Sequence, residues 1–261
     1  MNILDKIIAH KREELVIRKM MVSEKELVKS TYFDRACLSL CKNLLQENAT
    51  GIIAEFKRKS PSKGFINQFA DVVTITNAYT KFGASGISVL TDHEFFGGNT
   101  EDIVKARQNE IPILRKDFII DPYQIINSKA MGADVILLIA ACLSPAEVKS
   151  LASLAKQVGL EVLLELHDDD ELAHICDEID MVGINNRNLK TFEVDINRSL
   201  KLAEQIPFEK VKIAESGITN VETIKLFKEA GFKGFLIGEN FMKEKDTAGA
   251  FQKFVEQLKA G

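Results

Sequence analysis

The chain has 261 residues, of which 46% are hydrophobic and 28% are charged, and its formal net charge is −4. This composition predicts a soluble globular protein whose core is large enough to form without disulfides or metal ions. Lys and Arg are scattered along a mildly acidic chain, so the sequence does not predict a nucleic-acid surface.

Neither a membrane span nor a secretion signal is predicted. Charges interrupt the first twenty residues every few positions, and no stretch approaches about eighteen uncharged apolar residues. The four cysteines, Cys37, Cys41, Cys142 and Cys176, show neither C-x-x-C spacing nor a zinc pattern. We therefore expect a cytoplasmic protein without a metal site.

Residues 1–48 precede the first predicted strand and are expected to form a helical extension. Ile3, Ile7 and Ile8 fall on one helical stripe, and the charged residues KREE at 11–14 fall on the other. This pattern favours an appendage of the main domain over a separate domain.

From residue 51 onward, short apolar runs recur at intervals of roughly 20 to 35 residues, each followed by a segment with helical periodicity. The runs are Gly51–Phe56, Gly86–Leu90, Ile111–Arg115, Asp134–Ile139, Leu160–Glu165, Met181–Ile184, Val211–Ala214 and Gly234–Ile237. Eight such units without a linker predict an α/β fold, a closed (β/α)8 TIM barrel, with residues 1–261 as one domain. An open doubly wound sheet is the alternative, but no glycine-rich G-x-G-x-x-G turn follows the first run.

Helix starts are marked at three places along the chain. Residues 144–147 and 219–222 have the spacing of a capping box, with Ser144 and Thr219 as the predicted N-caps. Asp121 is followed by a proline, which is typical of a cap and the first helical position.

Strand ends carry the candidate catalytic groups, because the C-terminal ends of barrel strands form the active site. Glu55 and Lys57 end the first strand and point to the same side, although a surface ion pair explains them equally well. Lys116, followed by Phe118, ends the third strand, and Glu165 closes the apolar fifth strand. An unpaired buried carboxylate costs several kcal/mol, so Glu165 is expected to face Lys57 or Lys116.

Later strand ends predict anion binding. Asn185 and Arg187 follow the sixth strand, where they can orient a hydroxyl and hold an anion, although an Asx-rich turn also suits this segment. Gly217 and Gly238 follow the last two strands, where backbone N–H groups of barrels frequently bind phosphate.

Two other kinds of residue are interpreted as mostly structural. The four histidines lack metal-ligand spacing, and His167, at the start of a loop, is expected to contact solvent. Phe96 precedes a Gly-Gly pair and is either a loop anchor or one flank of an aromatic substrate.

Taken in order, these segments resemble the motifs of the indole-3-glycerol phosphate synthase family, including its N-terminal helix. The matching segments are ILDKIIAHKREEL at 3–15, IIAEFKRKSPSKG at 52–64, SVLTD at 88–92, LRKDFIIDPYQI at 114–125, LLELH at 163–167, GINNRNL at 183–189, AESGI at 214–218 and LIGE at 236–239. Some members of this family are fused to a second barrel, phosphoribosylanthranilate isomerase. The chain ends at Gly261 and resembles the stand-alone form.

The resemblance implies a reaction on a small phosphorylated substrate without a cofactor. In this reaction 1-(2-carboxyphenylamino)-1-deoxyribulose 5-phosphate is closed to indole-3-glycerol phosphate, with loss of carbon dioxide and water, in tryptophan synthesis. We also expect a monomer, able to associate weakly with other enzymes of the pathway, and the charge and hydropathy described above predict neither nucleic-acid nor membrane partners.

The same resemblance implies roles for individual residues. Lys116 would protonate the substrate carbonyl oxygen, Lys57 would share this acid work, and Glu165 would assist dehydration. The implied catalytic set is Glu55, Lys57, Lys116, Glu165, Asn185 and Ser216. Glu55 would set the charge of the lysines, and Asn185 would orient a sugar hydroxyl.

The implied substrate-binding set divides by the part of the substrate that it meets. It consists of Ser60 and Arg187 for the carboxylate, Phe96 and Phe118 for the aromatic end, and Gly217, Leu236, Gly238 and Glu239, beside Ser216, for the phosphate end. The carboxylate of Glu239 must turn outward, because it would repel a phosphate.

Two other functions fit a barrel with these residues. One is a lyase or aldolase that uses Lys57 or Lys116 as a Schiff-base nucleophile. The other is a catalytically silent barrel that binds a sugar phosphate. The presence of two lysines and two glutamates together counts against the second, because a binding protein needs only the anion contacts.

Overall fold

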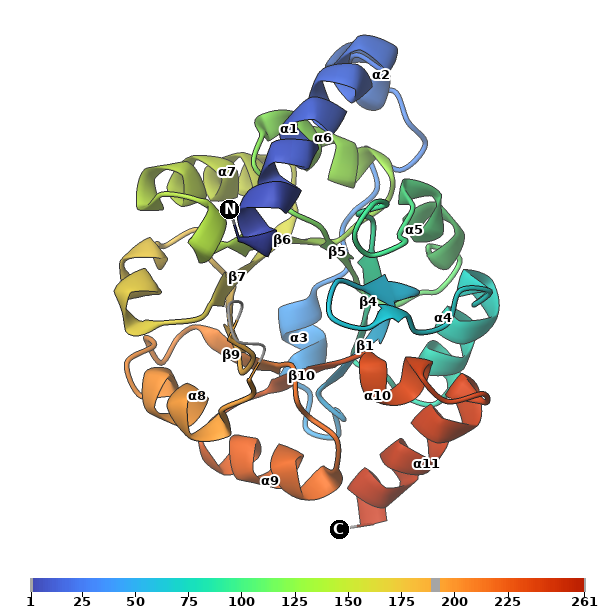
Figure 1. Cartoon of the computed structure of the whole chain (residues 1–261), viewed down its shortest axis with the longest axis vertical. Helices are drawn as coiled ribbons and strands as arrows, with labels where there is room; N and C mark the ends of the chain where they lie inside the picture. The colour runs from blue at the N-terminus through green and yellow to red at the C-terminus, as the bar shows by residue number, and fades with distance from the viewer. Residues whose placement is uncertain (1, 189–192, 261) are drawn as a thin grey trace.

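The computed structural model describes residues 2–188 and 193–260. Within these residues, eight parallel strands form a closed barrel, in which neighbours follow the order β1-β10-β9-β8-β7-β6-β5-β4 (Figure 1). The strands are β1 (Ile52–Phe56), β4 (Gly86–Leu90), β5 (Ile113–Lys116), β6 (Val135–Ile139), β7 (Glu161–Leu166), β8 (Met181–Asn185), β9 (Val211–Glu215) and β10 (Gly234–Ile237). The predicted TIM barrel is confirmed, and the open sheet is excluded.

Helices surround the barrel, as Figure 1 shows from one end. They are α4 (Val72–Lys81), α5 (Thr100–Ala106), α6 (Pro122–Ala130), α7 (Pro145–Gln157), α8 (Ile196–Ala203), α9 (Val221–Glu229), α10 (Glu239–Met242) and α11 (Thr247–Ala260), with the 3-10 helices η1 (Ala140–Cys142) and η2 (Asp169–His174). In the described part of the chain, η2 takes the place of an α-helix between β7 and β8. None of the helices among the described residues is long and apolar enough to cross a membrane.

Two of the three predicted helix starts are confirmed. Ser144 forms the capping box of α7, and Asp121 caps α6 ahead of a proline. The third prediction is wrong by one residue, because Asn220, and not Thr219, is the N-cap of α9. Its side chain accepts the N–H of Thr223, and Asn is the stronger N-cap of the two residue types.

Successive side chains along each strand point alternately into the barrel and out toward the helices. Ile53, Leu114, Leu163 and Ile213 belong to the core cluster that fills the interior, whereas their sequence neighbours pack outward against the helices. Two residues further along each strand, the same inward direction reaches the C-terminal opening. In β1, β5, β7 and β9 these final inward positions hold ionisable side chains, which are Glu55, Lys116, Glu165 and Glu215.

The opposite end of the barrel is closed by α3 (Leu40–Leu44) from the N-terminal extension. Leu40 and Leu44 belong to the interior cluster. A Cβ on Gly86 would lie 2.6 Å from Cδ1 of Leu40, so glycine is needed in β4 to admit this leucine. The extension therefore completes the core of the barrel.

The remainder of the extension lies at the C-terminal opening. It contains α1 (Ile3–Met21), which crosses one side of the opening, and the short α2 (Glu24–Leu27) (Figure 1). The buried stripe of α1 is Ile7, Lys11 and Leu15. The prediction that Lys11 lies on the polar face is therefore wrong, because carboxylates from the barrel loops meet its ammonium group.

A short antiparallel pair, β2 (Lys59–Ser60) and β3 (Gly64–Phe65), follows β1. This pair was not predicted from the sequence, because two-residue strands carry no periodic signal. It places Ser60 at the edge of the opening.

Candidate active site

A cavity of about 500 Å³ opens at the C-terminal end of the barrel, and all fourteen predicted site residues line it. They are Glu55, Lys57, Ser60, Phe96, Lys116, Phe118, Glu165, Asn185, Arg187, Ser216, Gly217, Leu236, Gly238 and Glu239. Leu189, the last residue of the sixth-strand motif, lies outside the described residues. The apolar side chains of Ile3, Leu4 and Ile7 add part of α1 to the wall.

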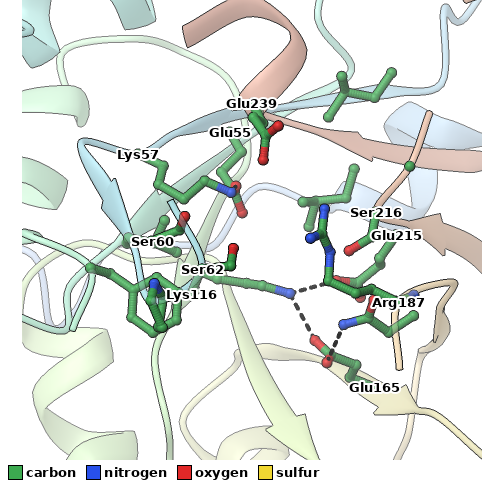
Figure 2. A pocket seen from close by; sticks show the side chains of 18 of the residues that line it. Glu55, Lys57, Ser60, Ser62, Lys116, Glu165, Arg187, Glu215, Ser216 and Glu239 are labelled. Carbon is green, nitrogen blue, oxygen red and sulfur yellow. Dashed lines mark hydrogen bonds and ion pairs between the residues drawn. The ribbon is translucent and has the colours of Figure 1, made fainter. Parts of the chain in front are cut away.

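Lys116 lies with its ammonium group between two carboxylates (Figure 2). Its Nζ is 2.8 Å from Oε2 of Glu165 and 2.5 Å from Oε2 of Glu215. Burial alone lowers the pKa of Lys116, but the negative charges of Glu165, Glu215 and Glu55 outweigh burial and raise this pKa above its ordinary value. Lys116 is therefore protonated at neutral pH, and the expected pairing of Glu165 with a lysine is present.

The two carboxylates beside Lys116 differ in charge. Burial acts to raise the pKa of Glu165, but Lys116 and His167 outweigh it and hold this pKa well below its ordinary value. For Glu215 burial is again the largest effect and is opposed by Lys116, yet the nearby charges of Glu165 and Glu55 help to raise the pKa to about 7. Glu165 is thus ionised at neutral pH, whereas Glu215 gains and loses its proton near neutral pH.

Glu215 is the site residue that the sequence analysis missed. A signal was present, because Glu215 closes the apolar strand β9 just as Glu165 closes β7. Gly183 of β8 makes room for it, since a Cβ at that position would collide with the Glu215 carboxylate.

Glu55 and Lys57 form an ion pair inside the cavity, with Nζ 2.6 Å from Oε1. Only 4% of the Glu55 side chain is exposed, so the alternative of a surface pair is excluded. Gly238 packs against this carboxylate, and a Cβ there would lie 2.5 Å from Oε1 of Glu55. The pair is therefore confined between β1 and the end of β10.

The backbone of the turns after β9 and β10 also lines the cavity, and β9 lies across the barrel from β5, which carries Lys116. Ser216 and Gly217 both have positive φ, at 67° and 72°. Gly238 is the N-cap of α10. The Glu239 carboxylate lies 2.5 Å from Nζ of Lys63, so its charge is directed to this lysine.

An aromatic pair and two polar side chains complete the wall. The rings of Phe96 and Phe118 lie 6.0 Å apart between centroids, tilted by 37°. The hydroxyl of Ser60 is buried without a hydrogen-bond partner among the described residues. Arg187 and Ser60 point into the same space as Lys116 (Figure 2).

His167 follows β7 and has only 5% of its side chain exposed, so the prediction of solvent contact is wrong. Its Nε2 lies 3.1 Å from Oε1 of Glu165, and its Nδ1 lies 3.7 Å from Oε2 of Glu171. Burial lowers the pKa of His167, but the two carboxylates outweigh burial and raise it to about 9. The prediction failed because η2 folds Glu171 back over the ring.

We expect the His167→Gln variant to lose a pH-dependent part of the stability. The folded-state pKa of about 9 exceeds the ordinary value of 6.5. The contribution of His167 is therefore fully present below pH 6.5 and is lost as the pH rises to about 9. At most it amounts to ~3 kcal/mol. Urea unfolding of both proteins across this pH range measures the difference in free energy of unfolding, and a difference that does not change with pH contradicts the prediction.

Comparison with known proteins gives a family match over almost the whole chain. A family profile described as indole-3-glycerol phosphate synthase matches residues 4–254. The indole-3-glycerol phosphate synthase of Bacteroides thetaiotaomicron is 47% identical over 258 residues, covering 98% of this chain and 99% of the relative. That of Bordetella pertussis is 42% identical over 259 residues, covering 97% and 99%.

Solved structures with low identity share the barrel. KGPDC from Streptococcus mutans has a TM-score of 0.59 at 18% identity, covering 80% of this chain and 97% of that chain. The tryptophan synthase alpha subunit of Legionella pneumophila has a TM-score of 0.61 at 14% identity, covering 85% and 95%. At this identity the likeness concerns the fold alone.

Proposed function

The chain belongs to the indole-3-glycerol phosphate synthase family, and from this premise we propose how its cavity carries out the reaction. The enzyme, a carbon–carbon lyase, closes 1-(2-carboxyphenylamino)-1-deoxyribulose 5-phosphate to indole-3-glycerol phosphate, with loss of carbon dioxide and water, in tryptophan biosynthesis. One observation carries the assignment of roles. The side-chain nitrogen of Lys116, in β5, lies between two carboxylates, and β5 is four strands around the barrel from β9, which leads into the turn at Ser216 and Gly217.

We assign the phosphate of the substrate to the turns after β9 and β10. Backbone N–H groups of Ser216, Gly217, Gly238 and Glu239 are the proposed donors, beside the side chain of Leu236. The turn at Ser216 and Gly217 favours this role, because successive backbone N–H groups in a turn conformation can bind an anion.

The other end of the substrate is assigned to the wall formed by the loops after β1, β4 and β5, together with Arg187 from the loop after β8. Phe96 and Phe118 flank the aromatic ring, and Ser60 and Arg187 bind its carboxylate. The unpartnered hydroxyl of Ser60 supports this placement, because a buried polar group without a partner costs free energy until a ligand satisfies it.

Ring closure requires an acid at the sugar carbonyl. As the aromatic carbon attacks the carbonyl carbon, the carbonyl oxygen takes a proton from Lys116 and becomes a hydroxyl group. Glu215, with a pKa of about 7, then returns a proton to Lys116. The attacking ring carbon then loses its carboxylate as carbon dioxide, and the electron pair of the broken bond restores the aromatic ring.

Dehydration requires a base and an acid on the same intermediate. Glu165, ionised and held by Asn185 through a 2.9 Å hydrogen bond, accepts the proton from the carbon beside the nitrogen. The hydroxyl group leaves as water with a proton from Lys57, which shares the acid work and is held by Glu55. Asn185 also orients a sugar hydroxyl.

The Schiff-base alternative requires a neutral lysine as nucleophile. The carboxylates that raise the pKa of Lys116 disfavour this state. Borohydride reduction in the presence of substrate separates the two mechanisms, since a covalent adduct on Lys57 or Lys116 would replace the proposed mechanism.

We expect the Gly217→Ala variant to raise KM at least about tenfold, because a Cβ there collides with Cγ1 of Val194 and strains a backbone at φ 72°. Gly231→Ala is the matched control. Gly231 has φ 86°, and its added Cβ meets no atom within 4 Å. Steady-state KM measurement tests this assignment, and an unchanged KM at position 217 would remove the turn from the phosphate site.

We further propose that residues 1–261 form one barrel domain that acts as a cytoplasmic monomer, with at most weak association with other enzymes of tryptophan synthesis. Four free cysteines support a reducing compartment. Analytical ultracentrifugation of the pure protein measures the oligomeric state.

The most direct test of the function is a fluorescence assay of indole formation from the carboxyphenylamino-deoxyribulose phosphate. The chain contains no Trp, so protein fluorescence contributes little background. A metal chelator in the buffer tests whether the reaction proceeds without a metal ion. Absence of product at saturating substrate would refute the proposed function.

A further inference from the structure

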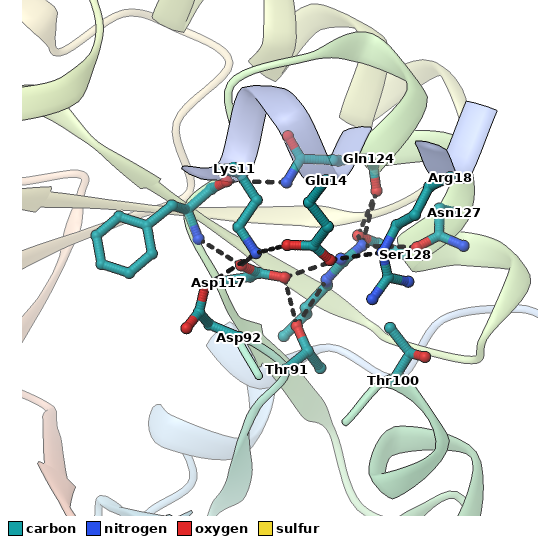
Figure 3. Close-up of polar contacts among 12 residues, drawn as sticks. Lys11, Glu14, Arg18, Thr91, Asp92, Thr100, Asp117, Gln124, Asn127 and Ser128 are labelled. Carbon is teal, nitrogen blue, oxygen red and sulfur yellow. Dashed lines mark hydrogen bonds and ion pairs between the residues drawn. The ribbon is translucent and has the colours of Figure 1, made fainter. Parts of the chain in front are cut away.

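A cluster of buried charges joins α1 to the loops that follow β4 and β5 (Figure 3). At its centre lies Lys11, of which 2% of the side chain is exposed. Its Nζ is 2.7 Å from Oε2 of Glu14, 3.0 Å from Oδ2 of Asp92 and 3.0 Å from Oδ1 of Asp117. Three carboxylates from three segments therefore meet one ammonium group.

Asp117 lies directly between Lys116 and Phe118 in the chain. Its Oδ1 accepts the N–H of Phe118 at 2.8 Å, in addition to facing Lys11. Its Oδ2 accepts the hydroxyl of Thr91 at 2.6 Å and pairs with Arg115 at 2.9 Å. The orientation of Asp117 thus fixes the backbone that carries Lys116 and Phe118.

Asp92 controls the second aromatic loop in the same way. Its Oδ1 accepts the N–H of Phe95 at 2.9 Å. Among the described residues, Lys11 is the only cation within ion-pair distance of Asp92. Phe96 follows in this loop and faces Phe118, so Lys11 contacts the supports of both rings of the aromatic wall.

We propose that Lys11 is a positioning residue for the reaction, which holds Asp92 and Asp117 and thereby fixes the aromatic wall and the backbone of Lys116. This inference rests on the proposed function of the cavity. The same helix contributes Ile3, Leu4 and Ile7 to the cavity wall. The contact that seats α1 therefore also sets the shape of the substrate site.

The two aspartates would respond differently to loss of the Lys11 charge. Asp117 keeps its ion pair with Arg115, whereas Asp92 loses the cation that it faces. A buried carboxylate without a partner is unstable, so Asp92 turns toward water and draws the Phe95–Phe96 loop with it. Burial lowers the pKa of Lys11, but Asp117, Asp92 and Glu14 outweigh it and raise this pKa, so the ammonium is charged at every pH of interest.

The test compares Lys11→Met with Lys6→Met, the same change at an exposed lysine of the same helix. We expect kcat/KM of Lys11→Met to fall between about tenfold and a hundredfold, with KM raised and kcat lowered, since misplacement by about 1 Å costs this much. Lys6→Met should stay within about twofold of the unaltered enzyme. The pH profile of kcat should not shift, because Lys11 does not exchange protons with the substrate.

A purely structural role gives a different result. Activity would then follow the folded fraction measured by circular dichroism, and KM would not change. A Lys11→Met enzyme that is folded and has normal KM and kcat overturns the proposal, as does a raised KM in Lys6→Met.

Asp92→Asn keeps the proposal falsifiable where Lys11→Met does not fold. It removes the charge through which Lys11 holds residue 92 beside the Phe95–Phe96 loop, and it leaves Lys11 paired with Asp117 and Glu14. We expect it to raise KM more than it lowers kcat, because the backbone of Lys116 stays fixed. Normal KM in a folded Asp92→Asn enzyme also overturns the proposal. If the unaltered enzyme is inactive, the proposed function is refuted. This outcome differs from failure of the Lys11 proposal, in which the unaltered enzyme is active and the variants behave like it.

Discussion

The Lys116→Met enzyme should turn over on the order of 10² to 10⁴-fold more slowly than the unaltered enzyme, because it lacks the acid that protonates the carbonyl oxygen. Methionine keeps most of the volume of the lysine side chain, so the change removes the charge and leaves little cavity. The measurement is kcat from indole fluorescence at saturating substrate.

Loss of this ammonium group leaves Glu165 and Glu215 facing each other without a cation between them. Two such carboxylates take up a proton and share it, so the barrel is expected to stay folded at neutral pH. Lys63→Met is the control, because Lys63 is an exposed lysine at the same opening that pairs with Glu239. A Lys116→Met enzyme with kcat close to that of the control contradicts the assignment of the acid.

The strands could be predicted from the sequence because each is apolar on both faces. The interior accepts Ile53 and Leu163, and the helices accept Ile52 and Leu164. The observed ends differ by at most two residues from the predicted ones, because the pattern is interrupted only where the chain leaves the sheet.

The site was largely predictable because a charged residue at the end of an otherwise apolar, buried strand must have a partner of opposite charge. Lys116 and Glu165 both end buried strands, and they lie together as expected. Glu215 ends a buried strand in the same way, but it was not predicted, because the serine and glycine directly after it indicate a phosphate-binding turn instead.

Lys11 and His167 could not be placed from local sequence. Periodicity assigns a lysine to the solvent side of a helix, and only Asp92 and Asp117, more than eighty residues away, make its burial favourable. His167 is buried by η2, where an α-helix was expected. In both cases the deciding contact is made in three dimensions between groups of opposite charge.

The Glu165→Gln enzyme should lose between about 10²-fold and 10⁴-fold in kcat while KM changes little. Glutamine has almost the same shape and can still contact Asn185, so binding of the sugar is retained. It cannot accept the proton that leaves during dehydration. The lost carboxylate also repelled an anionic substrate, so its removal does not weaken binding.

Glu171→Gln is the matched control for this variant. Glu171 faces the other side of His167 and does not line the cavity, whereas Glu165 contacts both His167 and Lys116. If Glu165 acted only by holding the histidine charged, both variants would lose activity together. Loss of kcat in Glu165→Gln alone, with the Glu171→Gln enzyme near normal, therefore assigns the effect to proton transfer at Glu165, and near-normal indole fluorescence from Glu165→Gln would refute that role.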